Sequence, residues 1–242
     1  MAGQLQDRLD KILAAEAADE ITIPVGTDYS GVVQINAAAM PHIAVAGNPG
    51  TEMTPFVQTL MAEMMLKYPP SRVQFMIYDS TLRAYERFRD TPYVRRFVER
   101  DAFGPGLEAF LNSMMKPAGG DERFSADTHV FLVVDRLQDL QLREAFGLRS
   151  ILINGRKQMK LHGLTVLDAT APKEFFDLFL KEICHISFCM DSACGRAFMN
   201  ESMTGALDAT GEILCKWSPR YNKCRPMLLS DADLDAAVEA VR

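Results

Sequence analysis

Residues 47–54 have the place and the length of a phosphate-binding loop. They read GNPGTEMT, follow a short apolar run and precede a helical pattern. The template G-x-x-x-x-G-K-[ST] works because backbone N–H groups surround the β-phosphate while the lysine neutralises the β and γ oxygens. Gly47 and Thr54 match this template, whereas Glu52 stands where the second glycine belongs and Met53 where the lysine belongs. The loop therefore has the outline of a nucleotide site without its positive charge.

The residue after the loop is Pro55, which lacks an N–H group and disfavours helical angles at the residue before it. We therefore expect the following helix to begin at Pro55, with Thr54 as its cap. This start moves N–H donors out of the loop. The residues still suited to contact a nucleotide are Gly47, Gly50, Thr51, Thr54 and Asp135.

Two later apolar runs end in residues that bear on the same chemistry. Asp135 follows the run VFLVV and is of the type that organises Mg²⁺ at a strand end. Arg136 comes next, where hydrolysing enzymes commonly carry a glutamate, and a guanidinium cannot act as a base. We expect Arg136 to pair with Asp135 and to fill the space of a metal. Ala171, after a further run, offers no side chain that could sense a terminal phosphate.

These residues favour an ordinary strand-to-helix turn that carries no catalytic residue, no metal ligand set and no cofactor. Two alternatives stay open: binding of ATP with Mg²⁺ but without turnover, and true hydrolysis. In the last case Lys160 or Arg196 would supply the missing charge. Loss of the lysine contact should cost phosphate binding roughly 1.5–3 kcal/mol.

Three other groups of residues invite a site and are assigned structural roles. Five cysteines lack the C-x₂-C spacing of zinc sites and are expected to be reduced, buried thiols; they are Cys184, Cys189, Cys194, Cys215 and Cys224. Four scattered histidines form no triad pattern; they are His42, His129, His162 and His185. Residues 83–101 contain six arginines interleaved with aromatic and acidic residues, and we expect a solvated helix there, with a protein or nucleic-acid interface as alternatives.

The elements that must position the loop alternate between apolar runs and helical patterns. Four runs predict strands buried on both faces, at His42–Gly47, Val73–Asp79, His129–Asp135 and Leu164–Ala169. Two more strands are predicted at Ile183–Met190 and Glu212–Trp217. Helices are predicted at Phe56–Tyr68, Arg83–Asp101, Leu107–Met115, Lys173–Glu182 and Asp231–Arg242, the last capped by Ser230, and a loop at Lys116–Asp127. This order predicts an α/β fold with a mostly parallel central sheet and helices on both faces.

Composition supports a globular protein. The 242 residues are 48% hydrophobic and 24% charged, which excludes a disordered, collagen-like or disulfide-rich chain. The 26 Lys and Arg against 32 Asp and Glu give a net charge of −6 and no general attraction to polyanions. No apolar run approaches the roughly 20 residues of a membrane span. The start lacks the pattern of a signal peptide, so we expect a cytoplasmic protein, with recruitment to a membrane-associated assembly left open.

Several segments together resemble the motor domain of FtsK/SpoIIIE-type DNA translocases. They are residues 23–26 (IPVG), 40–47 (MPHIAVAG), 134–140 (VDRLQDL), 162–170 (HGLTVLDAT) and 229–234 (LSDADL). The resemblance implies a RecA-like P-loop NTPase fold over residues 21–242, preceded by a helical segment at 1–20. It also implies a family of ring-forming ATPases that move double-stranded DNA, with related tandem domains in type VII secretion.

The same resemblance places this chain's departures at functional positions. The family's lysine corresponds to Met53, its second loop glycine to Glu52, its catalytic glutamate to Arg136 and its sensor glutamine to Ala171. Lys160 and Arg196 keep a positive charge that the family has, and the resemblance implies an interface role for them.

We therefore expect a non-hydrolysing domain that serves a larger ATPase, secretion or DNA-handling assembly. Its expected partners are proteins, either an active ATPase paralogue or further copies of this chain, with DNA less supported. The alternative is an ATP-dependent DNA translocase, or a type VII secretion ATPase domain, with an unorthodox pocket.

Overall fold

The computed structural model describes residues 20–40, 42–80, 83–99, 104–106, 128–177, 183–200, 203–207, 211–217 and 220–242. Its strands are β1 (Thr22–Asp28), β2 (Gly31–Asn36), β3 (His42–Gly47), β4 (Val73–Asp79), β5 (Val94–Glu99), β6 (His129–Val134), β7 (Leu161–Asp168), β8 (Cys184–Ser187), β9 (Ile213–Trp217) and β10 (Arg220–Pro226). Its helices are α2 (Met53–Lys67), α4 (Leu142–Met159), α5 (Lys173–Asp177), α6 (Ser192–Met199) and α7 (Asp231–Ala240), with the short 3₁₀ helices η1 (Glu86–Phe88), η3 (Leu137–Asp139) and η4 (Met203–Ala206).

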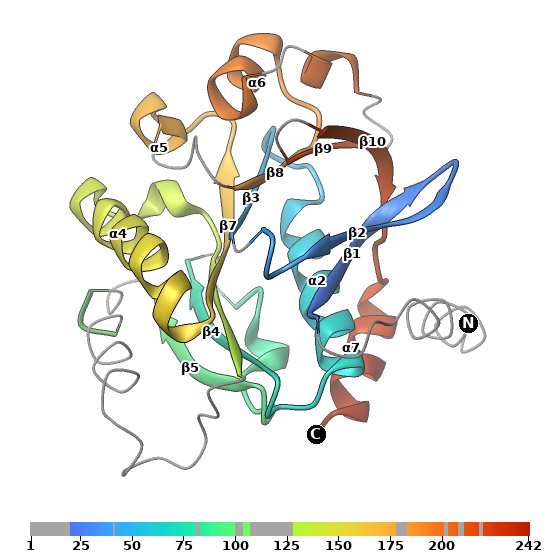
Figure 1. Ribbon diagram of the computed structural model, residues 1–242, viewed down its shortest axis with the longest axis vertical. Coiled ribbons are helices and arrows are strands. Elements are labelled where there is room, and N and C mark those ends of the chain that lie inside the picture. The colour runs from blue at the N-terminus through green and yellow to red at the C-terminus, as the bar shows by residue number, and fades with distance from the viewer. Residues whose placement is uncertain are drawn as a thin grey trace.

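One sheet joins all ten described strands in the order β2-β1-β10-β9-β8-β3-β7-β6-β4-β5. The six strands from β8 to β5 are parallel, whereas β9, β10, β1 and β2 continue the sheet through antiparallel pairs. The parallel block places the carboxyl ends of β3, β6 and β7 at one edge (Figure 1). That edge is where ligands bind in open α/β sheets.

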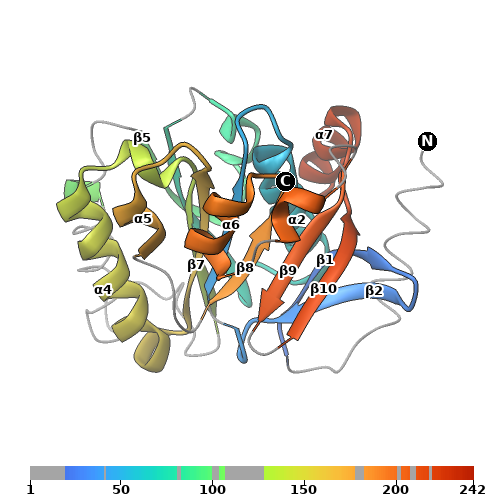
Figure 2. The ribbon, with the colours of Figure 1, turned by 90° about the horizontal axis from the view of Figure 1, so that it is seen from above.

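Helices cover both faces of the sheet, as the sequence predicts (Figures 1 and 2). Successive side chains of β3 point to opposite faces of the sheet. Ile43 and Val45 pack in the core under α2 and α7, whereas Ala44 and Ala46 pack in the core under α4, α5 and α6. The parallel strands are buried on both sides, which explains their nearly unbroken apolar sequences. The fold class is therefore confirmed.

Helix α2 is buried on almost every side. All ten residues from Phe56 to Met65 are buried, and they face the sheet, β1 and α7. A helix that is buried on nearly every side lies inside a protein, so the methionines of α2 are core residues. Pro69 follows directly after the C-cap residue Tyr68, as expected for a helix stop.

Four strands were not predicted, and one region was predicted as the wrong element. The unpredicted strands are β1, β2, β5 and β10. Residues 83–101 were expected to be helical, but in the described part they form the single turn η1 and the edge strand β5. Edge strands are commonly charged to prevent further pairing, so the arginines of β5 fit a strand as well as a helix. Strand β1 contains Pro24 and Gly26 and shifts register between them.

The closing helix and the thiols follow the predictions in outline. Ser230 caps α7, because its hydroxyl accepts a hydrogen bond from the Asp233 N–H at 3.2 Å. Three of the five free cysteines are buried: Cys184, Cys215 and Cys224. The other two, Cys189 and Cys194, are half-buried. The predicted helix at Leu107–Met115, the loop at Lys116–Asp127, the second half of the helix Lys173–Glu182 and the segment 1–19 lie outside the described residues.

The four histidines are buried, and three of them lie at the amino-terminal edge of the sheet, opposite the loop at residues 47–54. His129 Nδ1 lies 2.8 Å from His162 Nε2, and the two rings stack. The Gly163 N–H donates to His42 Nδ1 at 3.1 Å. These contacts join β3, β6 and β7 at their amino ends.

Two glycines should respond oppositely to alanine. A Cβ at Gly26 would collide with the backbone oxygen of Arg225 and lie 2.9 Å from the Cys224 sulfur, because β1 and β10 approach closely there. We expect Gly26→Ala to lower the free energy of unfolding by about 1–3 kcal/mol. Gly147, inside α4, has open space, and Gly147→Ala should raise it by about 0.5–1 kcal/mol. Urea unfolding of both variants measures this, and equal effects of the two would contradict the packing at Gly26.

Candidate nucleotide site at the carboxyl edge of the sheet

The loop at residues 47–54 leaves the carboxyl end of β3, between β7 and β8 in the middle of the sheet. Gly47 pairs with Asp168 at the end of β7, and helix α2 begins at Met53. The sequence therefore predicts correctly where the loop lies. Glu52 is the N-cap residue, and its side chain makes no capping hydrogen bond.

The loop is closed by hydrogen bonds of its own. The Asn48 N–H donates to the Cys189 carbonyl, and the Thr51 N–H donates to the Asn48 carbonyl, each at 3.1 Å. The Thr51 hydroxyl donates to the same Asn48 carbonyl at 2.7 Å. Pro49 has no N–H, and Gly50 takes the left-handed φ of 84° that this tight turn requires. Two of the N–H groups that a phosphate loop would offer to its ligand are thus used within the protein.

The space inside the turn is filled by side chains. A Cβ at Gly47 would lie 2.7 Å from the Thr51 hydroxyl, 2.7 Å from Phe188 Cβ and 3.2 Å from the Met53 sulfur. Only glycine fits there, which explains the template match at this position. Met53 is 8% exposed, so its thioether packs back against the loop instead of presenting a charge to solvent.

Thr54 is not a helix cap, and the predicted helix start is wrong by two residues. Helix α2 begins at Met53, which puts Thr54 and Pro55 within its first turn. Pro55 is tolerated there because the first N–H groups of a helix have no intrahelical acceptor. The Thr54 hydroxyl instead donates to Asp135 Oδ2 at 2.8 Å. Two of the residues expected to contact a nucleotide are therefore bonded to each other.

Asp135 is fully buried and is held by two hydroxyl groups. Its Oδ2 accepts from Thr54 and, at 2.9 Å, from the Tyr85 hydroxyl. Its Oδ1 is buried with no hydrogen-bond partner. Burial raises the pKa of Asp135 above its ordinary value, the two hydroxyl hydrogen bonds lower it in part, and the nearby Asp79 raises it further.

Tyr85 is a site residue that the sequence analysis did not identify. It lies in the connection after β4, is fully buried, and its N–H donates to Asp79 Oδ2 at 3.0 Å. Burial and the neighbouring Asp135 raise the pKa of the Tyr85 phenol well above its ordinary value, so it remains a donor. The sequence offered only an indirect signal for Tyr85. This residue follows shortly after Asp79, which ends β4, and β4 lies beside β6 in the sheet.

Arg136 does not pair with Asp135, so that expectation is wrong. Arg136 has a left-handed backbone, and its guanidinium bonds to Asp139 Oδ2 at 3.1 Å. The Arg136 side chain is half exposed, and Arg136 is the residue that precedes η3. Tyr85, and not Arg136, is the group that occupies Asp135 Oδ2.

The remaining predicted residues lie at two edges of the sheet. Ala171 lies in the turn after β7, where its N–H donates to the Asp168 carbonyl at 2.9 Å. Arg196 is exposed on α6, which follows β8 at the same edge as the loop. Lys160 ends α4 and precedes β7, so it lies at the opposite edge of the sheet and cannot supply charge to this loop.

The residues present do not fit a magnesium nucleotide. Thr54 and Asp135 are the residue types that hold Mg²⁺ in P-loop enzymes. However, Asp135 is buried beneath Tyr85, the loop uses donors internally, and Met53 brings no charge. Among the described residues, no group of three or more His, Cys, Asp or Glu side chains is arranged to hold a metal ion.

Comparison with known proteins finds similarity to one family. The FtsK/SpoIIIE family model matches residues 4–99, the part that contains the loop and α2. The DNA translocase FtsK of Streptomyces avermitilis is 24% identical over 194 residues, which cover 66% of this chain and 21% of the relative. These matches extend the resemblance to the FtsK/SpoIIIE family that the sequence motifs indicate. It spans about a fifth of the length of such curated relatives.

Solved structures show the same fold. The cytoplasmic domain of the Thermomonospora curvata type VII secretion ATPase EccC superposes with a TM-score of 0.69 at 11% identity, covering 95% of this chain and 32% of that chain. The pCW3 conjugation coupling protein TcpA, in a monomer form with ATPγS, gives a TM-score of 0.65 at 14% identity over 94% of this chain and 72% of that chain. The α/β architecture is therefore shared with these two solved structures.

Within the described residues, no helix is long and apolar enough to cross a bilayer.

The buried carboxyl should make the stability of the protein depend on pH in a defined direction. Asp135→Asn keeps an oxygen for Thr54 and Tyr85 but removes the charge. Because the pKa of Asp135 is raised from 3.8 in the folded state, its stabilising contribution is complete below about pH 3.8 and is lost as pH rises through the raised pKa. The wild type loses this contribution as pH rises, whereas Asp135→Asn has no charge to gain. We therefore expect the free energy of unfolding of Asp135→Asn, relative to the wild type, to increase as pH rises through this range, as measured by urea unfolding at several pH values.

Asp28 provides a control of opposite sign. Hydrogen bonds from Ser30 lower the pKa of this exposed carboxyl, so its contribution is present above pH 3.8 and is lost as pH falls through the lowered pKa. Asp28→Asn should therefore lose stability relative to the wild type near neutral pH and regain it in acid. If the free energy of unfolding changed with pH in the same way in the wild type and in Asp135→Asn, Asp135 would not be a strained buried acid.

Proposed function

We propose that this FtsK/SpoIIIE-type domain does not hydrolyse ATP and serves as a structural or regulatory part of a larger ATPase, secretion or DNA-handling assembly in the cytoplasm. The observation that carries the proposal is the filled loop, in which Met53 packs against Gly47 at the position where the template has lysine. A thioether cannot neutralise phosphate oxygens.

Binding and chemistry are each weakened by specific residues. A missing charge-assisted contact costs roughly 1.5–3 kcal/mol, which is about 10- to 150-fold in affinity. Glu52 adds an exposed carboxylate at the N-terminus of α2, where an anionic ligand would approach. Arg136 follows Asp135 and cannot orient or deprotonate a water. Together these residues argue against turnover even where some nucleotide binds.

Protein partners are favoured over DNA. The chain matches 32% of the EccC chain, so domains of this fold occur there as parts of longer proteins. Helix α4 carries three exposed apolar side chains on one face, Leu142, Phe146 and Ile153. Two of the arginines after β4, Arg87 and Arg89, are bonded to acidic side chains of this chain, which lowers the positive charge that the segment offers to DNA.

The alternative function is an ATP-dependent translocase of double-stranded DNA, or a type VII secretion ATPase domain, with an unorthodox pocket. The contact between Thr54 and Asp135 favours it, because these two residue types hold the metal in P-loop enzymes. In that case Arg196 is the remaining candidate for the missing charge, since it is exposed at the same edge of the sheet. Lys160 lies at the opposite edge of the sheet, so in either alternative it would act at an interface with another subunit.

Calorimetric titration with ATP and Mg²⁺, together with a phosphate-release assay, tests the proposal. We expect no turnover above background, with or without double-stranded DNA at low salt. Hydrolysis that is abolished by Asp135→Ala would overturn the proposal, and stimulation of that hydrolysis by DNA would establish the translocase alternative.

Restoring the template should restore affinity. We expect the double variant Glu52→Gly/Met53→Lys to bind ATP about 10- to 150-fold more tightly than the wild type, because it regains a charge-assisted contact of roughly 1.5–3 kcal/mol. Fluorescent ATP-analogue titration in EDTA measures this without metal. The matched control is Glu52→Gly/Met53→Leu, which removes the acid and keeps an apolar side chain at residue 53. Equal affinity of both double variants would show that the charge at residue 53 is not what limits binding.

A further inference from the structure

Asp135 meets Tyr85 where a cation would need open space. Both side chains are fully buried, and the Tyr85 hydroxyl bonds to Asp135 Oδ2 at 2.9 Å. A magnesium ion must coordinate a carboxylate oxygen directly while it keeps several water ligands, so it cannot bind Asp135 Oδ2 while the Tyr85 hydroxyl occupies that oxygen. The other carboxylate oxygen of Asp135, Oδ1, is buried and has no hydrogen-bond partner.

The backbone on each side of Tyr85 is held by other elements. Gln58 of α2 donates its side-chain amide to the Ala84 carbonyl, and the Tyr85 N–H donates to Asp79 at the end of β4. The Tyr85 carbonyl accepts from the Phe88 N–H at 3.0 Å, which starts the turn of η1. The ring therefore has little freedom to leave Asp135 unless η1 moves.

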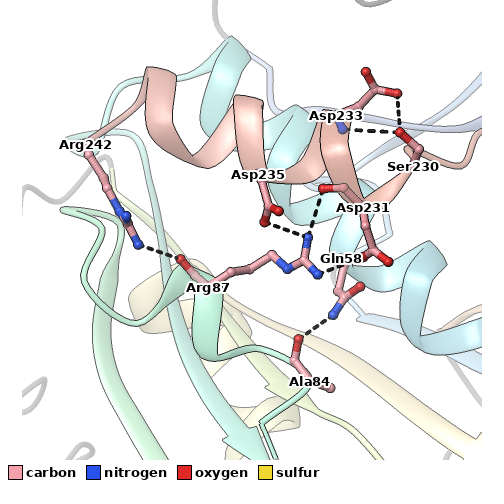
Figure 3. Close-up of polar contacts among 8 residues, drawn as sticks. All are labelled: Gln58, Ala84, Arg87, Ser230, Asp231, Asp233, Asp235 and Arg242. Atoms are coloured by element: carbon pink, nitrogen blue, oxygen red, sulfur yellow. Dashed lines mark hydrogen bonds and ion pairs between the residues drawn. The ribbon is translucent and has the colours of Figure 1, made fainter.

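Helix α7 holds η1 through one arginine, as Figure 3 shows. The Arg87 guanidinium bonds to Asp231 Oδ1 at 2.7 Å, to Asp235 Oδ1 at 3.0 Å and to the Asp231 carbonyl at 3.2 Å. In return, Arg242 donates to the Arg87 carbonyl at 3.2 Å. The Arg87 side chain is only 25% exposed, and its three acceptors come from two residues one helical turn apart, Asp231 and Asp235.

Helix α7 is itself fixed to α2. Leu234, Ala237 and Val238 pack in the core shared with α2. Just before α7, the Leu229 N–H donates to the Thr59 hydroxyl of α2 at 3.0 Å. The chain of contacts thus runs from α2 through α7 and Arg87 to Tyr85, and ends on Asp135.

We propose that Tyr85 is a plug that closes Asp135 to divalent cations, and that α7 keeps the plug in place through Arg87. This inference deepens the proposed function, because it names the residue that prevents a metal from binding. It concerns the metal alone and therefore does not depend on how the loop treats nucleotide.

Binding of Mn²⁺ without nucleotide, followed by the electron paramagnetic resonance of free Mn²⁺, tests the plug. We expect the wild type to leave Mn²⁺ free and Tyr85→Phe to bind it at least about tenfold more tightly, because the competing hydroxyl is gone. Adding Asp135→Asn to Tyr85→Phe should abolish that binding. Tyr93→Phe is the matched control, because the Tyr93 hydroxyl is bonded to the Met65 and Tyr68 carbonyls, away from Asp135.

A second pair of variants tests the part played by α7 and does not alter the core. Arg87→Gln should increase Mn²⁺ binding in the same direction as Tyr85→Phe, whereas Glu86→Gln, which breaks only the neighbouring pair with Arg89, should not. Should Tyr85→Phe fail to unfold cooperatively, the comparison of Arg87→Gln with Glu86→Gln decides the question.

Two results overturn the inference. One is Mn²⁺ binding by the wild type that Asp135→Asn removes, and the other is no gain in binding in folded Tyr85→Phe or Arg87→Gln. ATP hydrolysis by the wild type would instead overturn the proposed function, so the two failures are distinguishable.

Discussion

The carboxyl group of Asp135 is bonded to two hydroxyl groups from segments that are far apart in the chain. Thr54 lies in the first turn of α2 and Tyr85 follows β4, while Asp135 itself follows β6. A buried carboxylate is costly without donors, so the fold around this point must deliver both hydroxyl groups. The first turn of α2 and the connection after β4 supply these two hydroxyl groups. In metal-dependent enzymes of this fold a cation neutralises such a carboxylate; here the described residues provide only neutral donors.

The sequence predicts the centre of the sheet well because the central strands are buried on both faces. Strands β3 and β4 have the predicted bounds, and β6 ends one residue earlier than predicted. Strands β1, β2, β5 and β10 were missed, and two of them contradict a simple rule. Strand β1 contains a proline and a glycine at a register shift, and β5 contains adjacent arginines that resemble a helix surface. Pairing partners distant in the chain decide these elements, and local propensity does not.

The candidate site divides in the same way. The place of the loop and the mismatch at Met53 follow from the sequence, because they need only a template and its spacing. The contact between Tyr85 and Asp135 does not, since it requires knowing that β4 lies next to β6 in the sheet. Arg136 was assigned the wrong partner for a related reason. Its left-handed backbone turns the chain at the strand end, and the nearest acid becomes Asp139.

The pattern of matches and mismatches to the phosphate-loop template follows packing and not chemistry. Gly47 matches because any side chain there would collide with Phe188 and Thr51. Glu52 and Arg136 are exposed, so these positions accept departures from the template at little cost to the fold. Met53 is buried, and its unbranched side chain fills space that the apolar stem of a lysine could also fill. The stability of the domain depends on the two cores that flank the sheet, which include none of the exposed residues of the loop. The sheet and its flanking helices therefore do not depend on which residues occupy positions 52 and 136, which leaves the architecture compatible with departures from the template at both positions.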